Sequence, residues 1–376
     1  MGGRTPPQHP VNSATMGHMT RWRAHAAALV EVVRSRGVAM DPAWREAFLS
    51  VPRHVFVPRF YVDADGERLT GVVASGDPDW LRDVYTDEPL VTRRKRVRGP
   101  GGAEEYVATS SSSQPTVIAI MLELLDVREG MRVLEIGTGT GYHAALLCHR
   151  LGEEAVVSVD LDPELVVAAT ARLATLGFRP TVVAGDGAYG YAEGAPYDRI
   201  IVTAAADTIH PAWVEQLAPG GRIVAPLVEG GALVVGDKTA TDRVEGRIDT
   251  ECAFFMPMRA SLDGEETERH MWRQAAPELP VEPVEPGPEA LGDIDFRLWL
   301  GLSMRHVQYV YRPGAPPAPT GRADVPIEPE SLSRAWREFV AAGRPHRTRY
   351  GVTATGEGGW IWLDEPDSEH RWPLPL

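Results

Sequence analysis

The first hydrophobic pattern along the chain is helical. Apolar residues recur at three- and four-residue spacing from 26 to 33, and Gly37 is a plausible stop. A second short helix is expected from 42 to 50. Glycine, proline and charge then interrupt the pattern between 63 and 108. We therefore expect irregular structure there, in front of the main body of the fold.

From residue 114 onward, helical patterns alternate with short apolar runs that are typical of buried strands. The expected strands are 131–136, 155–160, 181–184, 199–203 and 222–227. The expected helices are 114–125, 142–151, 163–176 and 207–217. Asp162 and Pro163 supply the cap and the first turn of one of them. This alternation predicts an α/β fold with a parallel sheet and helices on both faces.

After Gly231 the pattern changes. Edge strands are expected at 232–236 and 252–258, and repeated Pro and Glu mark a linker at 275–288. The last part of the chain predicts strands at 296–302, 306–311, 350–355 and 360–363 and a helix at 330–342. The predicted domains are a disordered tail (1–20), a catalytic domain (21–260) with an insertion (91–109), a Pro/Glu-rich linker (261–291) and a small α+β module (292–376).

Composition excludes several classes of protein. The net charge of -14 argues against nucleic-acid binding, which depends on neutralising phosphates. No apolar run is long enough to span a membrane. The two cysteines, Cys148 and Cys252, form no CxxC pair, so we expect no disulfide and no metal site. This usage fits a reducing cytoplasm.

The strongest local motif lies between Val133 and Tyr142, where a strand ends and a helix begins. Its chemistry-bearing residues are Glu135, Gly137, Thr138, Gly139 and Gly141. A dinucleotide fingerprint would need glycine where Tyr142 stands, which disfavours an NAD oxidoreductase. A ligand without a pyrophosphate fits better, and S-adenosylmethionine (SAM) is one, with cationic groups that Glu135 can complement. A plain strand-to-helix turn is the alternative interpretation.

Two further strand ends support a nucleoside ligand. Asp160, followed by Leu161, closes the next strand, where a carboxylate accepts hydrogen bonds from both ribose hydroxyls. Asp186 and Gly187 follow the third strand. An acid there can reach the adenine amino group while glycine lets the ring lie against the backbone. We predict SAM as the cofactor, with S-adenosylhomocysteine (SAH) as its product.

Several ordered motifs then become specific. They are VPRHVFVP at 51–58, YTDEPL at 85–90, SQP at 113–115, GDG at 185–187, APYD at 195–198, VTAAA at 202–206 and EQLAPGG at 215–221. With the glycine loop, these runs resemble the protein-L-isoaspartate (D-aspartate) O-methyltransferase family over about 40–260. The resemblance implies a Rossmann-like class I SAM-dependent methyltransferase sheet with an N-terminal helical cover.

The resemblance also implies the active-site segment, Ser111 to Pro115. Ser113 falls on the family's serine that contacts the substrate carboxylate and lies against SAM. We predict Ser113, Ser112 and Gln114 as catalytic, and Ser111, Ser112 and Ser113 as cofactor contacts. A carboxylate is already ionised at neutral pH, so its methylation needs no general base. Hydroxyl donors can hold it without neutralising it. The segment can also cap the helix after it, and His54 and His143 are expected to be structural.

The basic run before this segment predicts substrate recognition. Arg93, Arg94 and Arg96 would flank the entrance and attract an acidic peptide, although a solvated loop is the simpler interpretation. Aromatic residues of the last module would add peptide contacts; these are Trp299, Tyr309, Tyr311, Trp360 and Trp362.

The extra segments resemble a branch of the family that tailors cyclised ribosomal peptides such as lanthipeptides and graspetides. We therefore predict a SAM-dependent O-methyltransferase that esterifies a specific Asp side chain of a constrained biosynthetic peptide. The ester would close to a succinimide (aspartimide) that persists or opens to isoaspartate. The alternatives are a general protein-L-isoaspartate repair methyltransferase and a SAM-binding protein without methyl transfer.

Overall fold

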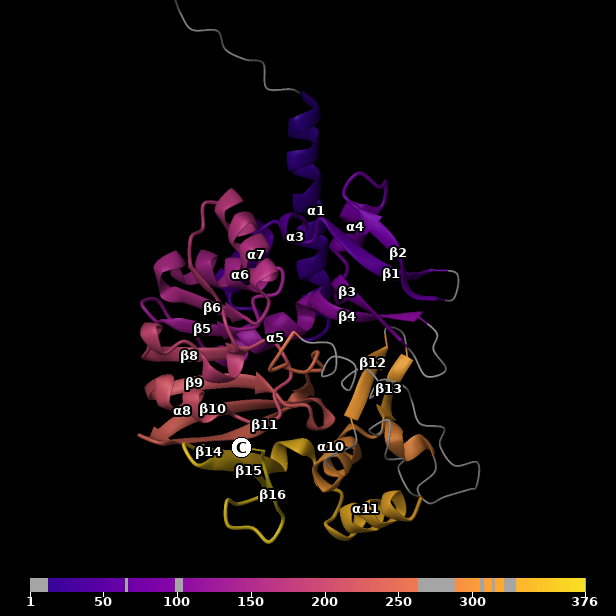
Figure 1. Ribbon diagram of the computed structural model, residues 1–376, viewed down its shortest axis with the longest axis vertical. Helices are drawn as coiled ribbons and strands as arrows, with labels where there is room; N and C mark the ends of the chain where they lie inside the picture. The colour runs from indigo at the N-terminus through magenta and orange to yellow at the C-terminus, as the bar shows by residue number, and fades with distance from the viewer. Residues whose placement is uncertain are drawn as a thin grey trace, which may run out of the picture.

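The computed structural model of the protein describes residues 13–64, 67–98, 104–262, 288–304, 308–312, 315–320 and 329–375 (Figure 1). Residues 1–12 of the expected tail and residues 263–287 of the expected linker lie outside this part of the chain. Residues 13–20 of the expected tail belong to helix α1 (Ser13–Ser35). None of the described helices is long and apolar enough to cross a membrane.

One ten-stranded sheet forms the centre, in the order β16-β15-β14-β11-β10-β9-β8-β5-β6-β7. Its parallel half consists of β7 (Thr181–Ala184), β6 (Val156–Asp160), β5 (Val133–Ile136), β8 (Tyr197–Val202) and β9 (Leu217–Pro226). The helices of this half are α5 (Pro115–Leu125), α6 (Tyr142–Leu151), α7 (Pro163–Thr175) and α8 (Pro211–Gln216). The predicted α/β class is therefore confirmed.

The antiparallel half of the sheet combines two distant parts of the chain. It consists of β10 (Ala232–Ala240), β11 (Arg243–Cys252), β14 (Tyr350–Thr355), β15 (Gly358–Leu363) and β16 (Arg371–Pro373). Thus the C-terminal strands extend the catalytic sheet instead of forming a sheet of their own. The expected strand at 252–258 is largely wrong, because β11 ends at Cys252 and the following residues form only an isolated bridge.

The C-terminal helices α10 (Ile294–Ser303) and α11 (Pro329–Ala341) pack into the same core as the sheet. The strand predicted at 296–302 is wrong, because these residues form α10, which Asp293 caps by accepting from the backbone N–H groups of Asp295 and Phe296. Trp299 and Trp362 are buried. A peptide therefore cannot contact them without rearrangement. Strands β12 (Gln308–Arg312) and β13 (Ala315–Thr320) form a separate hairpin.

A second sheet lies beside the parallel half and carries the basic run (Figure 1). Its order is β2-β1-β3-β4, with β1 (Arg59–Ala64), β2 (Glu67–Ala74), β3 (Leu90–Arg98) and β4 (Glu104–Ser112). The expectation of irregular structure here, and of a loop for the basic run, is wrong: the arginines lie along β3, which pairs with β4. Helices α2 (Pro42–Ser50), α3 (Arg53–Phe56) and α4 (Trp80–Val84) complete the N-terminal cover.

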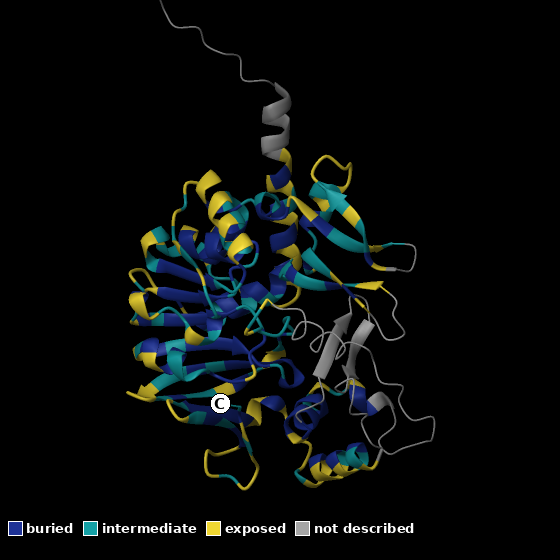
Figure 2. Ribbon diagram, in the orientation of Figure 1, coloured by how far each residue is buried: buried dark blue, intermediate teal, exposed yellow. Residues whose placement is uncertain are grey.

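The core explains why the site lies where it does. Strands β5 and β8 are buried along nearly their whole length (Figure 2). Ligands of α/β sheets bind outside the carboxyl ends of such strands. The second sheet delivers the end of β4 to that edge, so that the serine segment faces the glycine loop.

Candidate functional site

A cavity of about 530 Å³ opens at the carboxyl ends of β5 and β6. This volume suits a small-molecule site. The structure brings together ten of the predicted site residues as its lining: Ser111, Ser112, Ser113, Gln114, Gly137, Thr138, Gly139, Asp160, Leu161 and Gly187. The other predicted residues do not line it: Glu135, Gly141, Asp186, Arg93, Arg94 and Arg96.

The glycine loop has the backbone that the sequence motif requires. Gly137 and Gly141 adopt φ values of +102° and +88°, which other residues rarely tolerate. A Cβ at Gly137 would also lie 2.8 Å from the Thr203 hydroxyl oxygen. That hydroxyl donates to the carbonyl of Gly137 at 2.7 Å, so β8 fixes the loop. The loop therefore approaches the cavity with bare backbone.

Glu135 lies beneath this loop and is fully buried. Its carboxylate bonds with His143 Nδ1 at 2.6 Å and accepts from the Ser158 hydroxyl. Ser158 in turn bonds with the Thr138 hydroxyl at 2.6 Å. The carboxylate thus ties β5, β6, the loop and α6 together and does not face the ligand. His143 bonds with this carboxylate through Nδ1, and it also lines the cavity.

Asp160 faces the cavity at the end of β6. Its two carboxylate oxygens accept from the backbone N–H groups of Gly139 at 2.7 Å and Asp162 at 3.0 Å. Burial raises the pKa of the Asp160 carboxyl, against the effect of these two hydrogen bonds. A carboxylate has about four acceptor sites, so two remain for a diol. The next strand end differs, because Gly187 lines the cavity while Asp186 caps a short helix through the Ala188 N–H at 2.9 Å.

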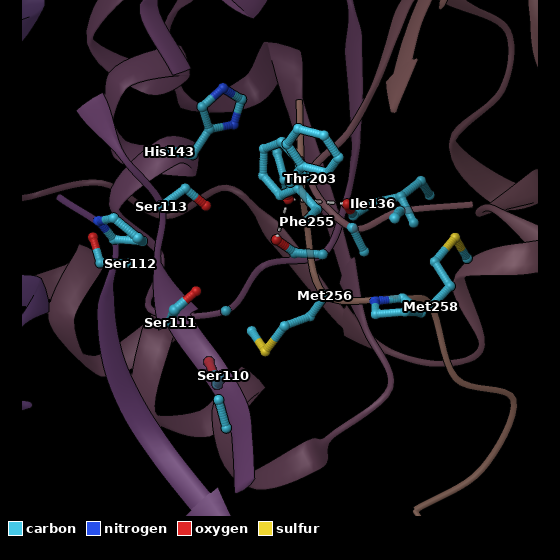
Figure 3. A pocket seen from close by; sticks show the side chains of 18 of the residues that line it. Ser110, Ser111, Ser112, Ser113, Ile136, His143, Thr203, Phe255, Met256 and Met258 are labelled. Atoms are coloured by element: carbon cyan, nitrogen blue, oxygen red, sulfur yellow. Dashed lines mark hydrogen bonds between the residues drawn. The ribbon is translucent and has the colours of Figure 1, made fainter. Parts of the chain in front are cut away.

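The serine segment, residues 110–113, lies at the end of β4, so successive hydroxyls point to opposite sides of the strand. Ser110 and Ser112 are buried, whereas Ser111 and Ser113 are partly accessible. Figure 3 shows the hydroxyls of Ser111 and Ser113 directed toward the cavity and that of Ser112 directed away from it. The alternative that these serines cap α5 is wrong, because Gln114 is the cap residue and makes no side-chain cap bond.

Arg53 holds this segment from behind and was missed by sequence reasoning. It is fully buried, and its guanidinium donates to the carbonyls of Val84, Thr86, Glu88 and Ser113 at 2.8–3.1 Å. A fifth, longer contact of 3.5 Å reaches the Ser112 hydroxyl. Burial lowers the pKa of Arg53 to about 10. Its only signal in the sequence is its place in the motif at 51–58.

Asp87 fixes the start of α5 in a similar way. Its carboxylate accepts from the Thr116 N–H and hydroxyl, each at 2.8 Å. Gln114 donates to the Asp87 carbonyl at 3.1 Å. Gln114 thus lines the cavity while its amide nitrogen faces the YTDEPL motif. Together, Arg53 and Asp87 set the position of Ser113 from both sides.

The predicted substrate arginines have partners within the chain. Arg93 pairs with Asp162 at 2.5 Å and with Glu164, and Arg96 pairs with Glu104 at 2.9 Å. Arg94 lies between the rings of Tyr61 and Tyr106, 4.3 and 3.7 Å from their centroids. The basic run therefore stabilises the second sheet and its junction with α7, and its side chains do not reach the cavity.

The segment after β11 forms the opposite wall of the cavity. Residues 252–259 all line it, Arg259 among them. Figure 3 labels three of the others, Phe255, Met256 and Met258. The N–H of Ala205 donates to the Met256 carbonyl at 2.9 Å, and the N–H of Met258 donates to the Ala205 carbonyl at 2.8 Å. These contacts anchor the wall to the loop after β8. The aromatic and methionine residues were missed because the sequence suggested an edge strand.

The chain is similar along much of its length to known methyltransferases. The profile of the family described as protein-L-isoaspartate(D-aspartate) O-methyltransferase matches residues 82–261. A protein named protein-L-isoaspartate O-methyltransferase 2 from Archaeoglobus fulgidus is 37% identical over 217 residues, which cover 57% of this chain and 84% of the relative. One from Aeropyrum pernix is 35% identical over 258 residues, covering 67% and 85% of the two chains. The chain belongs to the protein-L-isoaspartate(D-aspartate) O-methyltransferase family.

A solved structure named protein-L-isoaspartate O-methyltransferase shares the fold of this family member. It has a TM-score of 0.53 and 23% identity, and the alignment covers 90% of this chain and all of the other. The predicted class I methyltransferase fold is thereby confirmed. The protein is a SAM-dependent carboxyl O-methyltransferase, and SAM is its cofactor.

The cavity of this methyltransferase fits that cofactor. The bare backbone at Gly139 leaves room for a ligand against the loop, because a Cβ there would meet no atom closer than 3.6 Å. Asp160 offers two unused acceptor sites at the next strand end. A Cβ at Gly187 would lie 2.6 Å from the Ile136 side chain, so this part of the lining also stays bare backbone. The donor set is therefore that of a nucleoside held by backbone and one carboxylate.

Proposed function

We propose that the methylated group is the side-chain carboxylate of one aspartate in a constrained biosynthetic peptide. The observation that supports this proposal is that residues beyond the family profile pack directly behind residues that line the cavity. Arg347 is fully buried and donates to the Cys252 sulfur at 2.8 Å, and Cys252 lines the cavity. Helix α10 also packs on the loop at 229–231, where a Cβ at Gly230 would lie 2.6 Å from Leu298.

The chemistry needs few groups from the protein. SAM supplies an electrophilic methyl group on a sulfonium, and an aspartate carboxylate, ionised at neutral pH, is a sufficient nucleophile. Ser113 would hold the carboxylate by its hydroxyl without neutralising it, while Arg53 keeps the Ser113 backbone in place. Alignment of the reacting atoms is the main contribution of such a site. Ser112 faces Arg53 and therefore supports the segment.

The ester then explains the later product without further catalytic residues. The backbone nitrogen of the next residue attacks the ester carbonyl, methanol leaves, and a succinimide forms. Water can open this ring to isoaspartate or aspartate. A peptide whose rings bring that nitrogen close to the ester would react fastest, which is why a constrained substrate suits the proposal.

General repair of isoaspartyl residues is the second candidate. It is favoured by the names of the relatives and by the likeness of a solved protein-L-isoaspartate O-methyltransferase over 90% of this chain. That likeness means that an extended C-terminal part does not by itself imply a peptide-tailoring enzyme. The two candidates differ in which carboxylate is methylated, that of an aspartyl residue or that of an isoaspartyl residue. The methyl-transfer chemistry of the site is the same for both.

A methyl-transfer assay separates the candidates. SAM labelled in its methyl group is offered with three synthetic peptides: a linear isoaspartyl peptide, its linear aspartyl counterpart and a macrocyclic aspartyl peptide. Labelling of the macrocycle, followed by release of labelled methanol and loss of one water from the peptide mass, supports tailoring. Preference for the isoaspartyl peptide over any macrocycle supports repair. Deletion of 292–376 would not be informative, because α10 and β14 share the core of the sheet.

A further inference from the structure

Arg259 is a cation of the cavity that sequence reasoning did not assign. It lies in the wall after β11 and lines the cavity, as Asp160 does. Its guanidinium donates to the Thr109 carbonyl of β4 at 3.3 Å. Among the described residues, no carboxylate lies within ion-pair distance of it. It therefore differs from Arg93, Arg94 and Arg96 of β3, which have acidic or aromatic partners.

The neighbours of Arg259 place it on the nucleoside side of the cavity. Its positive charge acts on the Asp160 carboxyl and lowers the pKa of that group, against the larger opposite effect of burial. The preceding residue, Met258, approaches Gly187, where a Cβ would lie 3.2 Å from its terminal methyl. Asp160 and Gly187 stand at the ends of adjacent strands, β6 and β7. These are the positions expected to hold the ribose and the adenine.

Arg259 is also remote from the serine that faces the methyl acceptor. Its hydrogen bond is to Thr109 of β4, four residues before Ser113, which directly follows that strand. Because a strand rises about 3.3 Å per residue, these two positions are about 13 Å apart. An arginine anchored at Thr109 is thus better placed to meet the nucleoside than the reacting carboxylate.

We propose that Arg259 is a cofactor-binding residue that closes the cavity over the adenosine part of SAM. In this role it joins the wall after β11 to β4 through Thr109 and offers a planar cation to the nucleoside. A guanidinium can lie on the face of an aromatic ring and can donate to ribose oxygens from the same position. The contact would hold the adenosine of SAM and of SAH alike.

The test measures binding of SAH and of 5′-methylthioadenosine, which has the adenosine but lacks the amino-acid end. Titration calorimetry gives the affinities, and stopped-flow fluorescence gives the dissociation rate of SAH. In Arg259→Met, both ligands should bind about tenfold more weakly, with the loss in a faster dissociation rate, since a contact to the shared adenosine is removed. Arg259→Lys keeps the charge but loses the planar fork, and should recover only part of the affinity.

Arg96→Met is the matched control, because it removes the same charge from β3 without touching the cavity. It should leave both affinities within about twofold of the wild type, and equal thermal midpoints in the two variants would show that both fold. Weakened binding of SAH but not of methylthioadenosine would overturn the proposal, since the contact would then be to the amino-acid end. Unchanged binding of both ligands in Arg259→Met would overturn it as well. None of these readouts depends on which peptide is methylated.

Discussion

The buried guanidinium of Arg53 provides the sharpest test of how the active-site segment is held. In Arg53→Met the side chain keeps much of its volume, but four backbone carbonyls and one hydroxyl lose their donor. Hydrogen bonds to a charged group contribute about 1.5–3 kcal/mol each, and buried acceptors left without partners cost about 1–3 kcal/mol each. Water can reach some of these groups, so the losses do not add fully.

We therefore expect Arg53→Met to lower the free energy of unfolding by about 4 kcal/mol, less than the sum of these separate losses. Urea unfolding followed by circular dichroism measures this value by linear extrapolation. The matched control is Arg82→Met, because the Arg82 side chain is 62% exposed in its ion pairs with Asp79 and Asp83. An exposed pair of this kind is worth about 0–1 kcal/mol.

The same variant should also impair function where it still folds. Because Arg53 holds the Ser113 carbonyl and the Ser112 hydroxyl, its loss should raise the KM for peptide more than it changes SAH affinity. If the free energy of unfolding of Arg53→Met lies within about 1 kcal/mol of the wild-type value, the guanidinium is not the support that its hydrogen bonds suggest. The position of Ser113 would then depend on Asp87 and the backbone alone.

Three further results are expected. Asp160→Ala should weaken SAM binding by roughly 3 kcal/mol, since it removes a charged acceptor for two ribose hydroxyls; calorimetry that gives wild-type affinity would contradict this role. Ser113→Ala should lower turnover while SAH affinity stays within about twofold; wild-type turnover would reduce the serine to a structural residue. Burial raises the pKa of Cys252, so its alkylation by iodoacetamide should be slow at neutral pH and accelerate as the pH rises. Mass spectrometry should also find it slowed by SAH, because Cys252 lines the cavity, and equal rates with and without SAH would count against this.

Local sequence signals predicted the parallel half of the fold well. Residues 142–151 and 181–184 form α6 and β7 with the expected bounds, because periodicity and flanking residues agree there. Helix α10 was misread as a strand because a short, continuously apolar run fits either structure. The capping carboxylate of Asp293 was the signal that could have decided it. In β3 the arginines hid the alternation of a strand, and most of their acidic and aromatic partners lie far away in the sequence.

The sequence predicted which segments meet at the site, but it predicted less well which way their side chains point. Asp160 and Glu135 both stand on neighbouring parallel strands near their carboxyl ends, yet one faces the cavity and the other faces Ser158 and His143. A glycine loop fixes the backbone but not which way the carboxylate before it turns. Arg53 could not be recognised either, since a single arginine in a helical cover does not reveal that four distant carbonyls surround it.

The pairing of β11 with β14 has a consequence for how the chain is synthesised. Residues 243–247 of β11 pair with 351–355 of β14, so the last strands of the sheet leave the ribosome well after the glycine loop. Translation proceeds at about 5–20 residues per second, so one edge of β11 stays unpaired for several seconds before β14 is made. Such an edge is a template for association with other chains. Slowing translation between these two strands should therefore lower the soluble yield of this enzyme more than an equal delay after β14.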